Sequence, residues 1–305
     1  MKRFKKILVV LQPMSATEPV VDRAMQLARE NKAQVTIVSV QPELHHNMRD
    51  FVGAILQQQQ GPLDALAKIF AKKGISVTCS ALTGISFIEI VRTVIRDKHD
   101  LLMKTAKGRG GLSKWLFGST DLHLLRKCPR PVWIVKPTKR KKYARVLAAV
   151  DPDPGVEAHE ELNRHILELA TSLAIQEHSE LHVVHAWSVP NEKLMHSGRA
   201  RMSPKEISRI VRDFKKAHKE QLDKLLAQHD LTGITTRIHM AKGDPASIIS
   251  SVAKKTRTEL VIMGTVARTG VPGFFIGNTA EKTLGALDCS VMAIKPAAFE
   301  TPVTV

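Results

Sequence analysis

Residues 128–137 read CPRPVWIVKP and residues 289–296 read CSVMAIKP, so a cysteine, an apolar run and a Lys-Pro pair follow one another twice in this chain. Other segments recur in the same order and at similar spacing. They are 5–11 (KKILVVL) and 144–150 (ARVLAAV), 74–78 (GISVT) and 233–237 (GITTR), and 100–104 (DLLMK) and 259–264 (ELVIMG). Repetition on this scale predicts two homologous domains. We expect them at 1–138 and 145–305, joined by a basic linker at 139–144.

Within each copy, short apolar runs alternate with stretches of helical periodicity. The runs are continuously apolar, which predicts parallel strands covered on both faces. We expect strands near 6–11, 34–40, 75–80, 100–104 and 131–136, and near 145–150, 180–186, 234–239, 259–263 and 290–295. We expect helices near 17–31, within 46–73, and near 85–98, 118–127, 157–177, 203–229, 246–256 and 277–286. This alternation predicts an α/β fold with two tandem, doubly wound, five-stranded parallel sheets of strand order 3-2-1-4-5.

The composition is that of a globular protein, with 43% apolar and 25% charged residues. No apolar run approaches the ~18 residues that span a bilayer. Three cysteines, odd in number and far apart, argue against a disulfide framework. Cys128 and Cys289 occupy matched positions, which indicates a packing role. No histidine cluster has the spacing of a metal site, so we expect no metal. A cytoplasmic protein is expected.

The positive charge is concentrated in the first half. Residues 1–142 contain 26 Lys and Arg against 10 Asp and Glu, a net charge of +16, and the remaining residues contain 20 against 19. This asymmetry favours an anionic partner, either nucleic acid or a membrane surface. The alternative interpretation is a basic surface that is simply exposed to solvent. Aromatic residues are only 4% of the chain, which argues against a base-stacking surface for single strands.

A ligand crevice is expected where the strand order reverses, at the carboxyl ends of the first and fourth strands. In the first copy these ends carry Gln12 and the loop 104–119. In the second they carry Asp151 and the loop 264–279. Both loops are rich in glycine and end where a helix begins. Such an arrangement lets backbone N–H groups and the helix dipole hold an anion.

The repeat and these loops resemble the universal stress protein family, in its tandem two-domain form, over essentially the whole chain. This resemblance implies a fold like that of the adenine nucleotide alpha hydrolases. Family members that bind ATP carry Gly-x2-Gly-x9-Gly-Ser/Thr in the loop, and typically an Asp after the first strand that contacts adenine. The candidate ligand-binding residues are therefore Gln12, Thr105, Gly108, Gly118, Ser119, Asp151, Gly264, Ala267, Gly277, Asn278 and Thr279.

Neither copy keeps the whole pattern. The first has Gln12 in place of the Asp and Thr105 in place of the first glycine. The second has Asp151, but Ala267 replaces a glycine and Asn278 replaces the hydroxyl residue. Each copy has lost a part of the motif that the other copy keeps. This pattern favours loss of the ancestral nucleotide site over a retained ATPase. The other interpretation is structural, with these glycines serving turns or tight helix–strand packing.

The resemblance implies a non-catalytic stress-response protein that binds a small ligand and contributes to resistance to stress and DNA-damaging agents. The alternative is an ATP-binding protein with weak hydrolase or switch activity, in which ATP is the cofactor. The cationic first loop favours nucleotide-like anions, and the apolar second loop (Val271, Phe274, Phe275, Ile276) favours amphiphilic molecules. The family also implies that the two domains pair through their last strands as an internal pseudo-dimer, with a homo-oligomer as a further expectation.

Overall fold

The structure is a computed structural model that describes residues 4–13, 15, 18–42, 49–106, 117–138, 142–152, 157–196, 202–265 and 277–304. The chain forms two compact units. The first contains 1–142, 265–278 and 288–305, and the second contains 143–264 and 279–287.

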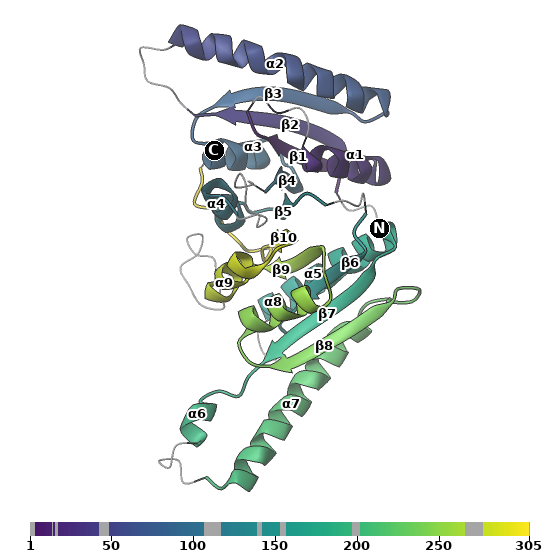
Figure 1. The fold of residues 1–305 in the computed structure, drawn as a ribbon, viewed down its shortest axis with the longest axis vertical. Coiled ribbons are helices and arrows are strands. Elements are labelled where there is room, and N and C mark those ends of the chain that lie inside the picture. Colours follow the sequence, from purple (N-terminus) through teal and green to yellow (C-terminus); the bar gives the residue numbers. More distant parts are fainter. Residues whose placement is uncertain are drawn as a thin grey trace. The chain divides into compact units, whose positions relative to one another are not determined.

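The first unit is built on a sheet whose parallel strands have the order β3-β2-β1-β4-β5 (Figure 1). The strands are β1 (Lys6–Leu11), β2 (Gln34–Gln41), β3 (Val77–Thr83), β4 (Leu101–Thr105) and β5 (Val132–Val135). The helices are α1 (Pro19–Asn31), α2 (Arg49–Lys72), α3 (Ser86–Arg96) and α4 (Ser119–Lys127). The predicted α/β class and the strand order 3-2-1-4-5 are confirmed for this copy.

The core follows from the apolar strands. Ile7, Leu101 and Trp133, on the neighbouring strands β1, β4 and β5, are fully buried. Because both faces of these strands are covered, every residue of the run can be apolar, and the backbone groups are paired within the sheet.

One further strand completes the first unit. β10 (Ser290–Ile294) comes from the end of the second copy and pairs antiparallel with β5, with Val291 opposite Ile134 and Ala293 opposite Val132. The expectation that the last strands of the two copies pair is confirmed by this register. The pairing also removes the exposed edge that β5 would otherwise present.

The second unit repeats the plan. Its parallel strands have the order β9-β6-β7-β8, which matches β4-β1-β2-β3 of the first unit. They are β6 (Arg145–Ala149), β7 (Glu180–Trp187), β8 (Thr236–Lys242) and β9 (Leu260–Gly264). The helices are α5 (Glu157–Glu177), α6 (Glu192–Met195), α7 (Pro204–Ala227), α8 (Pro245–Lys255) and α9 (Asn278–Ala286, its first residue assigned to the first unit).

Local signals explain where helices begin. The hydroxyl of Ser203 accepts a hydrogen bond from the backbone N–H of Glu206, and the Glu206 carboxylate accepts one from the backbone N–H of Ser203. Pro204 occupies the first helical position, where its missing N–H costs nothing. Asp244 caps α8 in a similar way by accepting from Ser247. Among the described residues, no helix is both long and apolar enough to cross a bilayer.

Three features differ from expectation. β3 and β8 begin and end later than the predicted ranges 75–80 and 234–239, because their extents are set by pairing with β2 and β7. The short helix α6 was not predicted, since four residues carry too little periodicity to be recognised.

The matched cysteines are buried, as predicted. Cys128 is fully buried, and Cys289 is 8% exposed. Burial raises the pKa of the Cys128 thiol to about 11, and burial together with the nearby Asp64 raises the pKa of Cys79 to about 11.

We therefore expect Cys79 and Cys128 to resist alkylation in the folded protein. At pH 8 only about one such thiol in a thousand is a thiolate, which is the reactive species. Iodoacetamide labelling followed by peptide mass spectrometry should find both modified slowly in buffer and rapidly in denaturant. Rapid native labelling of Cys128 would contradict its place in the core.

Candidate functional site

The first candidate cleft lies at the carboxyl ends of β1 and β4. These strands are neighbours and parallel, with Val10 opposite Lys104, so Gln12 and Thr105 come at the same edge of the sheet. The backbone N–H of Gln12 donates to the Glu18 carboxylate at 2.7 Å. The Thr105 hydroxyl accepts from the backbone N–H of Val20 at 3.4 Å, so this edge is tied to the start of α1.

The start of α4 adds Gly118 and Ser119 to this edge. Gly118 is the N-cap of the helix, with an extended backbone (φ −72°, ψ 170°), and the exposed Ser119 is the first helical residue. The backbone N–H of Gly118 donates to the Asp121 carboxylate at 2.8 Å. A carboxylate of the chain itself therefore accepts from the N-cap residue, close to the positive end of the helix dipole.

Asp121 also forms an ion pair with a strand residue. Its other carboxylate oxygen lies 2.8 Å from the Lys104 ammonium, and the side chains are 1% and 9% exposed. The Lys104 ammonium also donates to the Thr105 carbonyl at 3.0 Å. Sequence reasoning missed this pair, although a lysine within an otherwise apolar strand was a usable signal.

In the second copy, Asp151 follows β6 and Gly264 ends β9, and these two strands are also parallel neighbours. The Asn163 side chain holds the Asp151 backbone, since its Oδ1 accepts from the N–H and its Nδ2 donates to the carbonyl, each at 2.8 Å. A Cβ on Gly264 would lie 2.8 Å from a methyl group of Leu162 on α5. Close strand–helix packing is therefore one reason for a glycine at 264.

The remaining candidates lie at the start of α9. Gly277 is buried, and its N–H donates to the Thr265 carbonyl at 3.2 Å, whereas Asn278 and Thr279 are exposed. Gly108 and Ala267, together with most of both glycine-rich loops, lie outside the described residues. The apolar set predicted to line the second loop lies there too.

Lys295 is a buried amine that sequence reasoning did not single out. Its ammonium donates to the Leu125 carbonyl and the Thr265 hydroxyl, at 2.5 and 2.6 Å, and lies 4.9 Å from the centre of the Phe299 ring. Burial lowers its pKa from 10.5 to about 7, and the nearby Cys128 opposes this shift. The equivalent residue of the first copy, Lys136, has a carboxylate partner, Asp288, at 3.5 Å.

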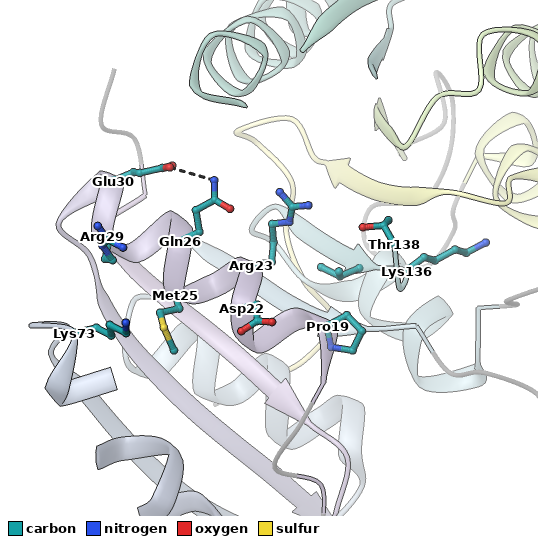
Figure 2. A pocket seen from close by; sticks show the side chains of 11 residues that line it. Pro19, Asp22, Arg23, Met25, Gln26, Arg29, Glu30, Lys73, Lys136 and Thr138 are labelled. Atoms are coloured by element: carbon teal, nitrogen blue, oxygen red, sulfur yellow. Dashed lines mark hydrogen bonds between the residues drawn. The ribbon is translucent and has the colours of Figure 1, made fainter. Parts of the chain in front are cut away.

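A cavity of about 480 Å³ lies along α1 in the first unit (Figure 2). Cationic residues outnumber acidic residues in its lining, and two of the cationic residues, Arg23 and Lys136, are buried. The lining residues are Pro19, Asp22, Arg23, Met25, Gln26, Arg29, Glu30, Lys73, Val135, Lys136 and Thr138. This excess charge suits an anionic molecule.

Four histidines of the second unit form two pairs. His182 and His239 have ring nitrogens 2.9 Å apart, and His185 and His218 have ring nitrogens 3.1 Å apart. His182 and His185 thus contact different elements, as strand alternation predicts. The partners are far apart in sequence, which is why spacing did not reveal them. In the described part of the chain, no three potential ligands converge on a metal position.

Comparison with known proteins places this fold in context. The family model "Universal stress protein family" matches residues 3–136 and 142–295. The chain is 28% identical to Universal stress protein E of Escherichia coli K12, over 99% of this chain and 98% of that protein. It is 27% identical to a Universal stress protein E homolog of Haemophilus influenzae, over 96% and 98%.

Solved structures show the same architecture. A putative universal stress protein from Pseudomonas aeruginosa superposes with a TM-score of 0.71 at 24% identity, covering 97% of this chain and 95% of that one. A universal stress protein from Archaeoglobus fulgidus superposes with a TM-score of 0.67 at 17% identity, covering 95% and 98%.

The buried amine of Lys295 makes a pH dependence of stability testable. Its pKa is lower in the folded protein than in the unfolded chain, so the unfolded state binds more protons between pH 7 and 10.5. Stability contributed by this group therefore rises with pH through that window and is lowest below pH 7.

Relative to Lys295→Met, we expect the wild type to gain about 2 kcal/mol between about pH 7.5 and 9, since each pH unit contributes about 1.4 kcal/mol. Urea unfolding at several pH values measures both proteins. Parallel pH profiles for the two would show that Lys295 keeps an ordinary pKa.

Proposed function

Because the chain belongs to the universal stress protein family, we propose that it is a non-catalytic stress-response protein that binds a small ligand in the clefts between the first and fourth strands of its two copies. The ligand is nucleotide-like or amphiphilic. Through this binding the protein contributes to resistance to stress and DNA-damaging agents.

The observation that carries this proposal is the strand-order reversal in each unit. β1 lies between β2 and β4, and β6 lies between β7 and β9. The connections on the two sides of such a central strand diverge, and ligands of open α/β sheets bind in the crevice left at the carboxyl ends. Gln12 and Thr105 stand at this edge in the first unit, and Asp151 and Gly264 in the second.

The second candidate function is ATP binding with weak hydrolysis or a nucleotide switch. It is favoured by the exposed hydroxyl of Ser119 at the first turn of α4, the position at which the family motif places a phosphate-binding hydroxyl. Release of phosphate from ATP beyond one equivalent per chain separates this function from binding alone.

An anionic partner of the basic first copy is part of the proposal. The excess of positive charge among residues 1–142 and the cationic cavity along α1 both support it. We further propose a cytoplasmic location, which is supported by the finding that no cysteine in the described part of the chain forms a disulfide, because disulfides are rare in reducing compartments.

Ligand binding is tested by native mass spectrometry of the full chain purified under mild conditions. We expect a bound small molecule that denaturation releases. Asp151→Ala should lower the occupancy of the second cleft roughly tenfold, because a hydrogen bond to a charged group is removed. Asp230→Ala, a carboxylate that accepts from Thr232 in a turn before β8, is the matched control.

A chain that carries no small molecule, and whose melting temperature is unchanged by ATP, adenosine or a fatty acid, would contradict the proposal. Equal loss of ligand in Asp151→Ala and Asp230→Ala would argue against a ligand at the β6 edge.

The anionic partner is tested with duplex DNA as a probe. If the basic surface binds it through phosphates, affinity should fall at least about tenfold between about 50 and 200 mM salt, because counterions are released on binding. Fluorescence anisotropy measures this. An affinity independent of salt would exclude an electrostatic contact of this kind.

A further inference from the structure

A buried carboxylate of the chain lies where α4 begins, beside the carboxyl end of β4. The Asp121 carboxylate accepts from the Gly118 N–H at 2.8 Å and pairs with the Lys104 ammonium at 2.8 Å. Asp121 is fully buried. Both donors lie where α4 begins beside the end of β4, which is the edge of the proposed cleft.

We propose that Asp121 determines the ligand specificity of the first cleft, since its carboxylate occupies the anion position at the start of α4 and thereby excludes a ligand phosphate. The cleft then accepts ligands that bring no anion to this position. This inference rests on the proposed ligand-binding function and specifies the ligand class of one of its two sites.

The second copy shows that the fold does not require the ion pair. In the repeat, Met263 corresponds to Lys104, and Ala280 corresponds to Asp121. Both are buried, at 3% and 4% exposure, on β9 and α9. The same two elements therefore form with apolar residues at the equivalent positions. A buried ion pair often contributes no more stability than an apolar pair of similar volume, so its presence in only one copy points to a role in recognition.

Electrostatics explains the exclusion. A ligand phosphate and the Asp121 carboxylate would compete for the same donors, the Gly118 N–H and the Lys104 ammonium. A second anion beside the first would also be repelled strongly at a buried position, where water screens charges poorly. Lys104 neutralises only one negative charge, so a phosphate can enter only if the carboxylate is removed or displaced.

The test compares ATP affinity of the full-length wild type with that of Asp121→Ala. The variant frees the Gly118 N–H and leaves the Lys104 ammonium without its carboxylate. We expect ATP to bind roughly tenfold more tightly or better, measured by isothermal titration calorimetry at moderate salt. The control is Asp97→Ala, which removes the same charge from an exposed pair with Arg96 at the opposite edge of the sheet and should leave ATP affinity unchanged.

Because Asp121→Ala leaves a buried lysine unpaired, the double variant Lys104→Met/Asp121→Ala is measured beside it. This variant has the residues of the second copy and no unpaired charge. It should bind ATP more tightly than the wild type, but less tightly than Asp121→Ala, because the backbone donor is free and the cation is gone. If Asp121→Ala does not fold, the inference is tested by the ATP affinity of the double variant compared with that of the wild type.

The inference is overturned if a folded Asp121→Ala binds ATP no more tightly than the wild type or Asp97→Ala. It is also overturned if the wild type binds ATP and Asp121→Ala weakens that binding. Whether the wild type carries a ligand from the cell is a separate measurement. A gain in ATP affinity together with an empty wild type would support this inference and contradict the proposed function.

Discussion

The constraint on which the structure depends is the burial of β1 and β6 on both faces. A strand that is buried in this way must pair its backbone groups with two neighbours, and in both units those neighbours are parallel. Parallel pairing brings the carboxyl ends of adjacent strands to one edge, and the crossover helices lie on the faces of the sheet. The edge at which each cleft is proposed is therefore a consequence of apolar strand sequences, and the residues after the strands are free to vary in their chemistry.

That freedom is visible in how the two copies differ. Equivalent positions hold an ion pair in one copy, Lys104 with Asp121, and two apolar residues in the other. The lysines after the last strands differ as well. Lys136 has a carboxylate partner, whereas the contacts found for Lys295 in the described residues are two neutral oxygen atoms and an aromatic ring. Duplication preserved the packing pattern, and divergence changed the charges placed within it.

The sequence predicted the bounds of an element well where its own buried apolar residues determine them. It predicted them less well where pairing with an adjacent strand determines them. The strand predicted at 6–11 coincides with β1, because the apolar run 7–11 is buried on both faces and burial of this kind is typical of a central parallel strand. β3 lies at the edge of its sheet, and its extent follows the register with β2, which a single segment does not contain. The edge positions of Gln12 and Asp151 were predictable, since a strand end determines them. The Lys104–Asp121 pair was not, because it joins a strand to a helix across a loop.

The ion pair also changes how the partial loss of the family motif is understood. The first copy keeps Gly118 and Ser119, so the motif alone suggests a cleft close to nucleotide binding. The donor that such a motif offers to a phosphate is, however, already used by Asp121. A retained glycine therefore does not show that anion binding is retained, because its N–H can donate to a side chain of the protein itself. In the second copy the equivalent position of the helix holds Ala280, which has no carboxylate to accept from the backbone. The starts of α4 and α9 therefore differ in the groups that can accept from the backbone, although the two elements occupy matching places in the repeat.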